Sequence, residues 1–173
     1  MAVSLVLGGA RSGKSRFAQT SAELTASKNG VRPVMIVTAE IYDDEMAERV
    51  RQHRQDRSGQ WDTVESPHAV ADAIARLGAS DVAVVDCMTL WLTNLMLAEC
   101  DLETEIARLL EALQQTPARV WVVSNEVGWG IVPDNALARR FRDEAGRLNQ
   151  RLAVVADDAW LIVAGMKIPL ERF

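Results

Sequence analysis

The residues best suited to chemistry lie near the start of the chain, where Gly8 opens the pattern G-x-x-x-x-G-K-S that Ser15 closes. Gly8 and Gly13 allow a tight turn whose backbone N–H groups face inward and form a nest for anions. Lys14 adds an ammonium group for β- and γ-phosphate oxygens, while the Ser15 hydroxyl suits the Mg²⁺ that bridges them. The pattern therefore predicts nucleoside triphosphate binding by the residues of this loop, which are Gly8, Gly9, Ala10, Arg11, Ser12, Gly13, Lys14 and Ser15.

Such a loop must join a strand to a helix, and its two flanks have the required patterns. Residues 4–7 form an apolar run that predicts a buried strand. Residues 14–28 follow with helical periodicity, and the residues expected on the packed side are Phe17, Ala18, Ser21 and Leu24. This succession of strand, loop and helix favours a phosphate-binding loop over a glycine-rich turn with an exposed lysine.

Apolar runs of strand length recur along the chain and alternate with helical patterns, which is typical of a parallel sheet covered by helices on both faces. We therefore predict an α/β fold and a single domain over residues 1–173. Strands are expected at residues 4–7, 33–38, 82–86, 120–124 and 160–163, with a possible short strand at 62–65. Helices are expected at residues 14–28, 43–54, 68–77, 88–99, 102–114 and 135–156.

The charge and the cysteine content of the chain indicate which kinds of binding partner to expect. The net charge of −5 disfavours a nucleic-acid backbone as the main ligand, because nucleic-acid domains usually carry a basic excess. Cys87 and Cys100 lack metal-ligand spacing, and the first strand has no signal peptide before it, so we expect a cytoplasmic protein. Residues 82–100 are apolar, but polar positions such as Asp86 interrupt them, which indicates a strand and a helix rather than a membrane span. Small molecules are the expected partners.

A phosphate-binding loop needs an acidic partner for its metal, usually at the end of a neighbouring apolar strand. The run Val82-Ala-Val-Val-Asp86 supplies one, so Asp86 is the candidate that would position Mg²⁺ together with Ser15. A strand-ending aspartate can instead merely cap the next helix. Glu65, at the end of the possible short strand, is a weaker acidic candidate.

Of the two histidines, His53 has the more suggestive surroundings, because helical spacing places Arg49 and Arg57 on its face. Cations there favour neutral imidazole, which is the nucleophilic form, and guanidinium groups can hold a phosphate beside it. Attack on a nucleotide α-phosphate would give a phosphoramidate. On these residues alone a solvated helix histidine is still the better interpretation, and His68, at a predicted helix start, is expected to be an ordinary surface residue.

The predicted helix at 135–156 has an apolar stripe and several arginines. The stripe is Leu137, Phe141, Ala145, Leu148 and Leu152, and the spacing allows an ion pair between Asp143 and Arg147. The arginines are Arg139, Arg140, Arg142, Arg147 and Arg151. Each one singly is best interpreted as part of a solvated face, although together they could serve phosphate groups.

Several segments, taken together, carry a more specific signal. They are the loop Gly8-Gly-Ala-Arg-Ser-Gly-Lys-Ser15, Asp43-Asp-Glu-Met46, Arg49-Val-Arg-Gln-His53-Arg54, Trp61, Asp86-Cys-Met-Thr-Leu-Trp-Leu-Thr-Asn94, Asn125-Glu-Val-Gly-Trp-Gly-Ile-Val-Pro133 and Phe141-Arg-Asp-Glu-Ala-Gly-Arg-Leu-Asn-Gln150. In this order they closely resemble the bifunctional adenosylcobinamide kinase/adenosylcobinamide-phosphate guanylyltransferases of cobalamin biosynthesis. The resemblance covers nearly the whole chain.

The resemblance implies phosphorylation of adenosylcobinamide by ATP or GTP, followed by transfer of GMP from GTP to adenosylcobinamide phosphate through a guanylyl-histidine. By motif position that histidine is His53, and Lys14 would assist catalysis at the phosphates. The implied nucleotide contacts outside the loop are Val37, Thr38, Ala39, Arg54, Gln55, Asp56, Arg57, Glu65 and Asp86. The family also implies a RecA-like phosphate-loop fold and a homotrimer with sites near subunit contacts.

Trp129 and two other functional classes remain open at this point. Trp129, between two glycines, would contact the corrin or another subunit, or else pack in the core. A plain small-molecule kinase would use the same loop without a covalent histidine. A nucleotide-switched binding protein or nucleic-acid module is disfavoured by the acidic balance and by the absence of a basic and aromatic tract.

Overall fold

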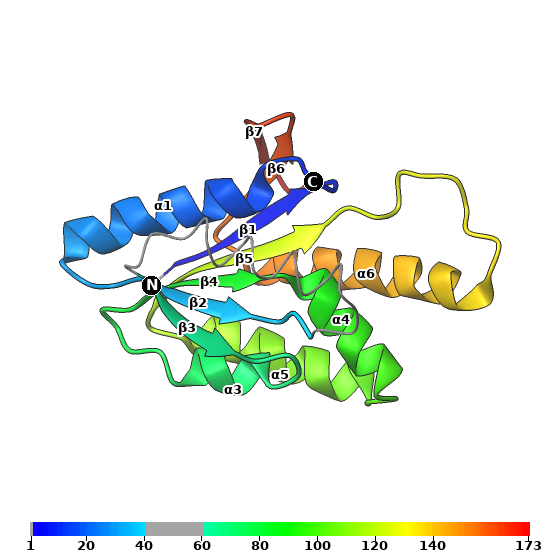
Figure 1. The fold of residues 1–173 in the computed structure, drawn as a ribbon, viewed down its shortest axis with the longest axis horizontal. Coiled ribbons are helices and arrows are strands. Elements are labelled where there is room, and N and C mark those ends of the chain that lie inside the picture. The colour runs from blue at the N-terminus through cyan, green and yellow to red at the C-terminus, as the bar shows by residue number, and fades with distance from the viewer. Residues whose placement is uncertain (1, 41–60) are drawn as a thin grey trace.

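The computed structural model describes residues 2–40 and 61–173. Within them lies a seven-stranded sheet with the strand order β3-β2-β4-β5-β1-β6-β7 (Figure 1). The strands are β1 (Ala2–Gly8), β2 (Val34–Val37), β3 (Asp62–Glu65), β4 (Val82–Asp86), β5 (Arg119–Asn125), β6 (Asp158–Val163) and β7 (Met166–Leu170). The helix expected at residues 43–54 lies outside the described residues.

The first six strands pair in parallel, and the apolar runs of all of them except β3 predict this. β1 lies between β5 and β6, and β4 lies between β2 and β5. The possible short strand at 62–65 is confirmed as β3. The α/β fold with a mostly parallel sheet is therefore confirmed, whereas the single domain over the whole chain stays a prediction.

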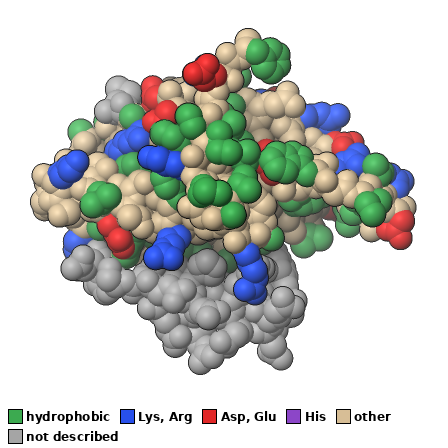
Figure 2. Space-filling model, turned by 90° about the horizontal axis from the view of Figure 1, so that it is seen from above, with side chains coloured by type: hydrophobic (Ala, Val, Ile, Leu, Met, Phe, Trp, Pro, Cys, Tyr) green, Lys and Arg blue, Asp and Glu red, His purple; other side chains and the backbone are tan. Residues whose placement is uncertain are grey.

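The last strand, β7, was not predicted. It pairs antiparallel with β6 at the edge of the sheet, and its five residues are all exposed. Lys167 and Pro169 interrupt the apolar run, and both residue types are typical of sheet edges. Figure 2, which views the molecule from the side of β7, shows hydrophobic side chains gathered over this edge, where Met166, Ile168 and Leu170 are exposed.

Helices cover both faces of the sheet, as expected. Helix α1 (Lys14–Asn29) packs on one face. The other face carries α3 (Val70–Ala75), α4 (Met88–Leu97), α5 (Leu102–Gln115) and α6 (Ala136–Val155) (Figure 1). Alternate residues of each strand feed the two cores, so that Leu5 packs with α3 to α6 while Val6 packs with α1. No helix in the described ranges is long and apolar enough to cross a membrane.

Helix α1 confirms Phe17 and Ala18 on its packed side and corrects Leu24. Its buried apolar residues are Ala18, Ala22 and Ala26, spaced four apart, whereas Leu24 is 61% exposed. Small side chains on this stripe let the helix backbone lie close to the sheet. The sequence favoured burial of Leu24 because its side chain is large and apolar. At the three alanine positions the helix lies so close to the sheet that only alanine side chains fit between them.

Helix α6 confirms most of its predicted stripe and corrects its first member. Ala145, Leu148 and Leu152 are buried, but Leu137 is 58% exposed because the first turns extend past the packed layers. The predicted pair of Asp143 with Arg147 is wrong. The ion pairs are instead Arg142 with Asp143, Arg147 with Glu144 and Arg151 with Glu103.

Candidate functional site

The predicted site residues in the described part of the chain meet at one edge of the sheet. Parallel strands all end on the same side, so β1 delivers Gly8, β2 delivers Val37 and β4 delivers Asp86 to that edge. Val37 is in register with both Asp86 and Glu65 on its two neighbours. This is the place where open α/β sheets bind ligands.

The loop after β1 has the tight turn that its glycines predict. A Cβ on Gly8 would lie 2.5 Å from the Ser12 Oγ atom and 2.6 Å from the Ile162 carbonyl oxygen, so only glycine fits there. Gly13 has φ +96°, a left-handed conformation that glycine adopts without strain. The Ser12 N–H bonds to the Gly9 carbonyl at 3.3 Å, which closes the turn upon itself.

The turn joining β6 to β7 supports this loop from the side. The Gly165 N–H donates to the Ser12 carbonyl at 2.9 Å, and the Gly165 Cα would lie 3.4 Å from a Cβ on Gly13. Lys167 continues the contact, with its ammonium 4.8 Å from the Trp160 ring centre and 5.8 Å from that of Phe17. The unpredicted hairpin therefore helps to fix the shape of the loop.

Two polar groups in the loop are placed for an anionic ligand. The Lys14 side chain is buried, and its ammonium donates to the Gly9 carbonyl at 3.0 Å, so the positive charge lies within the loop. The Ser12 Oγ atom is buried and has no hydrogen-bond partner in residues 2–40 or 61–173. A buried hydroxyl without a partner costs free energy, which an accepting phosphate oxygen would recover. The loop therefore fits nucleotide phosphates.

Ser15 and Asp86 suit a magnesium ion that also binds phosphate. Ser15 lies in the first turn of α1, and Asp86 is the half-buried last residue of β4. Residues 2–40 and 61–173 hold no cluster of three or more His, Cys, Asp or Glu side chains that could bind a metal by themselves. Mg²⁺ commonly takes one or two protein oxygens and completes its shell with phosphate and water, so this sparse donor set fits it.

Thr38 ties the end of β2 to the end of β4. Its buried hydroxyl donates to the Cys87 carbonyl at 2.7 Å and accepts from the Cys87 N–H at 2.8 Å, and its own N–H donates to the Asp86 carbonyl at 3.3 Å. The Asn94 side-chain amide of α4 donates to the Thr38 carbonyl at 2.8 Å. The backbone beside Asp86 is thus held on both sides. The contact of Thr38 with a nucleotide stays a prediction.

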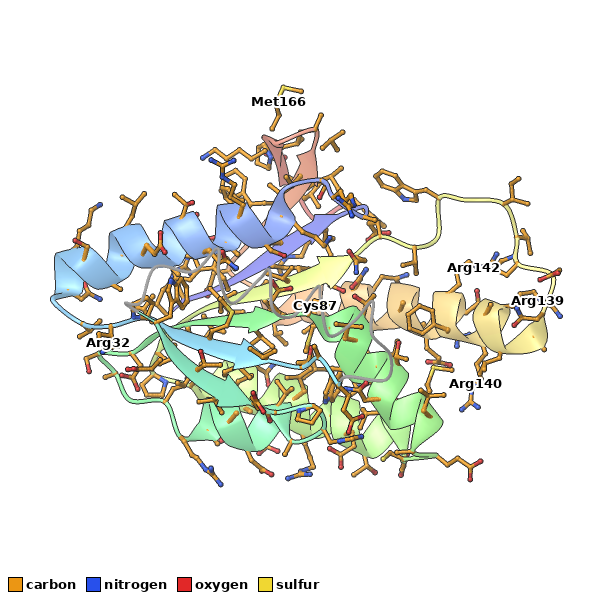
Figure 3. All side chains as sticks on the ribbon, viewed as in Figure 1. Arg32, Cys87, Arg139, Arg140, Arg142 and Met166 are labelled. Atoms are coloured by element: carbon orange, nitrogen blue, oxygen red, sulfur yellow. The ribbon has the colours of Figure 1, made fainter. Side chains whose placement is uncertain are left out.

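The pKa of the Cys87 thiol responds to its burial and to nearby charged groups. Burial raises the pKa of its thiol above the usual 9.0, and the adjacent Asp86 carboxylate raises it further. A hydrogen bond with Thr89 and the positive charge of Lys14 act in the opposite direction on this pKa. The thiol therefore lies within electrostatic reach of both the metal candidate and the loop lysine, and it stays protonated at neutral pH. Figure 3 shows Cys87 near the ends of the central strands.

A second polar group at this edge was not predicted as a site. Asn125 ends β5 and is in register with Gly8, and its amide donates to the Thr89 Oγ1 atom at 2.6 Å. Asn149 of α6 donates to the Asn125 carbonyl at 3.1 Å and to the Glu126 carboxylate at 3.0 Å. The sequence could have predicted Asn125 as a site residue, because Asn125 ends an apolar strand just as Asp86 does.

The remaining predicted contacts fall into two groups. Ala39 is half-buried two residues after the end of β2, and Glu65 is exposed at the end of β3, so both belong to the same edge as Asp86. The others lie outside the described residues, and their roles stay predictions: His53, Arg54, Gln55, Asp56 and Arg57.

The arginines of α6 belong to a different part of the surface. Arg139, Arg140 and Arg142 lie along the part of α6 that is distant from Cys87 (Figure 3). A groove of about 600 Å³ runs between α6 and the start of α5, and its lining includes Arg140, Arg147 and Arg151. The last two of these are already ion-paired with carboxylates. This arrangement favours a solvated, ion-paired face over a phosphate site.

Comparisons with known proteins identify relatives of the whole chain. Its sequence is 44% identical to the "Bifunctional adenosylcobalamin biosynthesis protein CobP" of Pseudomonas aeruginosa, over 96% of each chain. It is 41% identical to the proteins of similar name, CobU, of Salmonella typhimurium and Escherichia coli, over 96% of this chain and 98% of each relative. A solved KaiC-like protein from Pyrococcus horikoshii matches with a TM-score of 0.48 and 14% identity, over 92% of this chain and 70% of that one.

A family model gives the same assignment. The model described as "Cobinamide kinase / cobinamide phosphate guanyltransferase" matches residues 4–170, which include the phosphate-binding loop, Asp86, the Asn125 segment and the arginines of α6. With this match and relatives above 40% identity over nearly their full length, the chain belongs to the cobinamide kinase/cobinamide phosphate guanyltransferase family.

Proposed function

We propose that this chain carries both activities of its family, phosphorylating adenosylcobinamide and then transferring GMP from GTP to the resulting phosphate. The observation that carries this proposal is the phosphate-binding loop, with its buried Lys14 and unpartnered Ser12 hydroxyl, at the sheet edge that also receives Asp86. The products would be adenosylcobinamide-GDP and pyrophosphate.

In the kinase step the loop would hold the triphosphate of ATP or GTP and Lys14 would neutralise charge on the transferring γ-phosphoryl group. The aminopropanol hydroxyl of adenosylcobinamide would attack the γ-phosphorus, lose its proton and release the nucleoside diphosphate. Ser15 and Asp86 would hold Mg²⁺, which supplies charge neutralisation at the phosphate oxygens when bound. Lys14 already lies inside the loop, so its charge needs no new placement.

In the transfer step a His53 nitrogen would attack the α-phosphorus of GTP and release pyrophosphate. The GMP would then be bound to the histidine through a P–N bond. A phosphate oxygen of the acceptor would next attack the same phosphorus, which breaks that bond, forms the diphosphate and regenerates the imidazole. Arg54 and Arg57 would offset negative charge at the α-phosphate, and Gln55, Asp56 and Glu65 would complete the nucleotide contacts.

Two features of setting belong to the same proposal. A reducing, cytoplasmic location suits Cys87 and Cys100, neither of which forms a disulfide. A homotrimer would place each site near a subunit contact, and sedimentation of the purified protein tests it directly. These features are independent of the chemistry, so either can fail without affecting the proposed reactions.

The decisive experiment uses Mg²⁺ and GTP labelled at the α-phosphate, without any acceptor, followed by denaturation and treatment with acid or alkali. We expect a protein-bound label that is labile in acid and stable in alkali, as a phosphoramidate is. His53→Ala should take up no label. His68→Ala is the matched control, because His68 is the only other histidine in the sequence and should label normally.

Phosphoryl transfer to adenosylcobinamide is measured in parallel with GTP labelled at the γ-phosphate. Retention of this activity in His53→Ala, together with loss of the covalent label, supports separate roles for the loop and the histidine. If the wild type binds GTP and phosphorylates adenosylcobinamide but takes up no α-label, the covalent transfer is wrong and the chain is a plain kinase.

A further inference from the structure

The segment joining β5 to α6, residues 126–135, is unusually apolar for an exposed loop, and we call it the β5–α6 loop. The exposed fraction is 72% for Trp129, 98% for Ile131 and 62% for Val132. The loop extends away from the layers of the fold (Figure 1). Among the described residues, the Trp129 indole N–H has no hydrogen-bond acceptor. Adjacent apolar side chains left in water indicate a surface that a ligand or partner covers.

The loop begins between the two halves of the nucleotide site. β5 lies between β4, which ends in Asp86, and β1, which leads into the phosphate-binding loop. The Glu126 N–H donates to the Gly8 carbonyl at 3.1 Å. Any molecule that receives a phosphoryl or nucleotidyl group from this site must approach the same strand ends, and the β5–α6 loop projects from them.

Hydrogen bonds to α6 anchor both ends of the β5–α6 loop, on either side of its exposed apolar middle. At the first end, Asn149 binds the Asn125 carbonyl and the Glu126 carboxylate. At the second end, the Arg139 guanidinium donates to the Pro133 carbonyl at 2.9 Å and to the Asp134 carbonyl at 2.7 Å. Residues 127–132 thus form a strap presented from two fixed points.

The backbone of the strap is open on both sides of its aromatic residue. Gly128 and Gly130 flank Trp129, and a Cβ at either glycine would meet no atom of the described residues within 4 Å. Packing therefore does not require glycine at these two positions. Glycine there instead leaves the backbone bare on both sides of the indole, so that a ligand can approach closely.

We propose that residues 127–132 bind the corrin ring of the acceptor, with Trp129 as the main contact. This inference rests on the function proposed above. A corrin is a wide ring whose rim carries methyl and carboxamide groups, too large for the phosphate-binding loop to cover. An indole offers a flat apolar face to such a ring and an N–H group to a carboxamide oxygen. Ile131 and Val132 extend the apolar contact.

The test compares Trp129→Ala and Trp129→Phe with the wild type, measuring kcat and KM separately for GTP and for adenosylcobinamide. We expect Trp129→Ala to raise KM for adenosylcobinamide about tenfold, equivalent to about 1.4 kcal/mol, with kcat within about twofold. Trp129→Phe should restore most of the affinity because it keeps an aromatic face. Leu24→Ala is the matched control, since Leu24 is also exposed and apolar but lies on α1.

Acceptor-free labelling by α-labelled GTP separates this proposal from the proposed function. It should be unchanged in Trp129→Ala, because it needs no corrin. Absence of labelling in the wild type would count against the covalent step, not against the strap. Unchanged KM for adenosylcobinamide in Trp129→Ala overturns the strap as a corrin site. If Trp129→Ala has a smaller sedimentation coefficient than the wild type and a raised KM for GTP, the corrin proposal is also overturned, and the strap is assigned to contact with a second copy of the chain.

Discussion

Replacing Gly8 with alanine tests whether the shape of the phosphate-binding loop is set by steric contact. The added Cβ would lie 2.5 Å from the Ser12 Oγ atom and 2.6 Å from the Ile162 carbonyl oxygen. The Ser12 hydroxyl can rotate away at small cost. The Ile162 carbonyl belongs to β6, which pairs with both β1 and β7, so this contact can be relieved only by moving backbone.

The expected loss follows from the cost of overpacking. Forcing one carbon into such a site costs about 1–3 kcal/mol of unfolding free energy. For a protein of this length, 1 kcal/mol corresponds to roughly 2–4 °C in Tm, so Gly8→Ala should lower Tm by about 2–12 °C. GTP at a hundred times its Kd should stabilise the wild type by about 2.7 kcal/mol, and this gain should shrink in Gly8→Ala because the anion nest is displaced.

Gly9→Ala is the matched control in the same loop. A Cβ on Gly9 would meet no atom within 4 Å in the part of the chain that the structure describes, so the Tm of Gly9→Ala should stay within a few degrees of the wild type. Thermal unfolding followed by circular dichroism, with and without GTP and Mg²⁺, gives both quantities. Equal Tm values and equal stabilisation by GTP in the two variants would show that contact with Ile162 does not shape the loop.

Two further predictions concern the strand ends beside Asp86. Burial raises the pKa of the Cys87 thiol, so only Cys100 should react with a thiol reagent in the folded protein. Above about pH 9.0 the unfolded thiol loses its proton while the folded thiol keeps it, so the free energy of unfolding should fall as the pH rises through this range. Urea titrations of Cys87→Ala at several pH values should show a weaker fall. Thr38→Val leaves the buried Cys87 N–H without an acceptor, so urea unfolding should show a loss of about 1–3 kcal/mol, and Thr38→Ser, which keeps the hydroxyl, less than half of it.

The central elements could be predicted because their sequence patterns are local. Residues 82–86 are all apolar until Asp86, and β4 has these bounds. The pattern from Gly8 to Ser15 predicted a loop between a strand and a helix, and β1 and α1 flank it. In both places the hydrophobic run, the glycine positions and the chain direction lead to the same structure.

Errors arose where the decisive contact is distant in the sequence. The stripe of α1 follows from how closely the helix approaches β4 and β5, which selects Ala22 over Leu24, and no local pattern encodes that distance. β7 exists because the edge of β6 accepts an antiparallel partner, although Lys167 and Pro169 weaken its own strand signal. The exposure of Trp129 likewise follows from the direction in which its loop leaves the sheet.

The strand order links the two proposed binding regions and explains why their effects should separate. β5 lies between β4 and β1, so its continuation is the only backbone within the described strands that leaves the sheet between Asp86 and Gly8. The Glu126 N–H bonded to Gly8 and the Asn149 amide bonded to Glu126 fix that exit. A change at Trp129, three residues further on, leaves this fixed exit intact. Loss of the indole should therefore weaken acceptor binding without altering the loop that binds GTP.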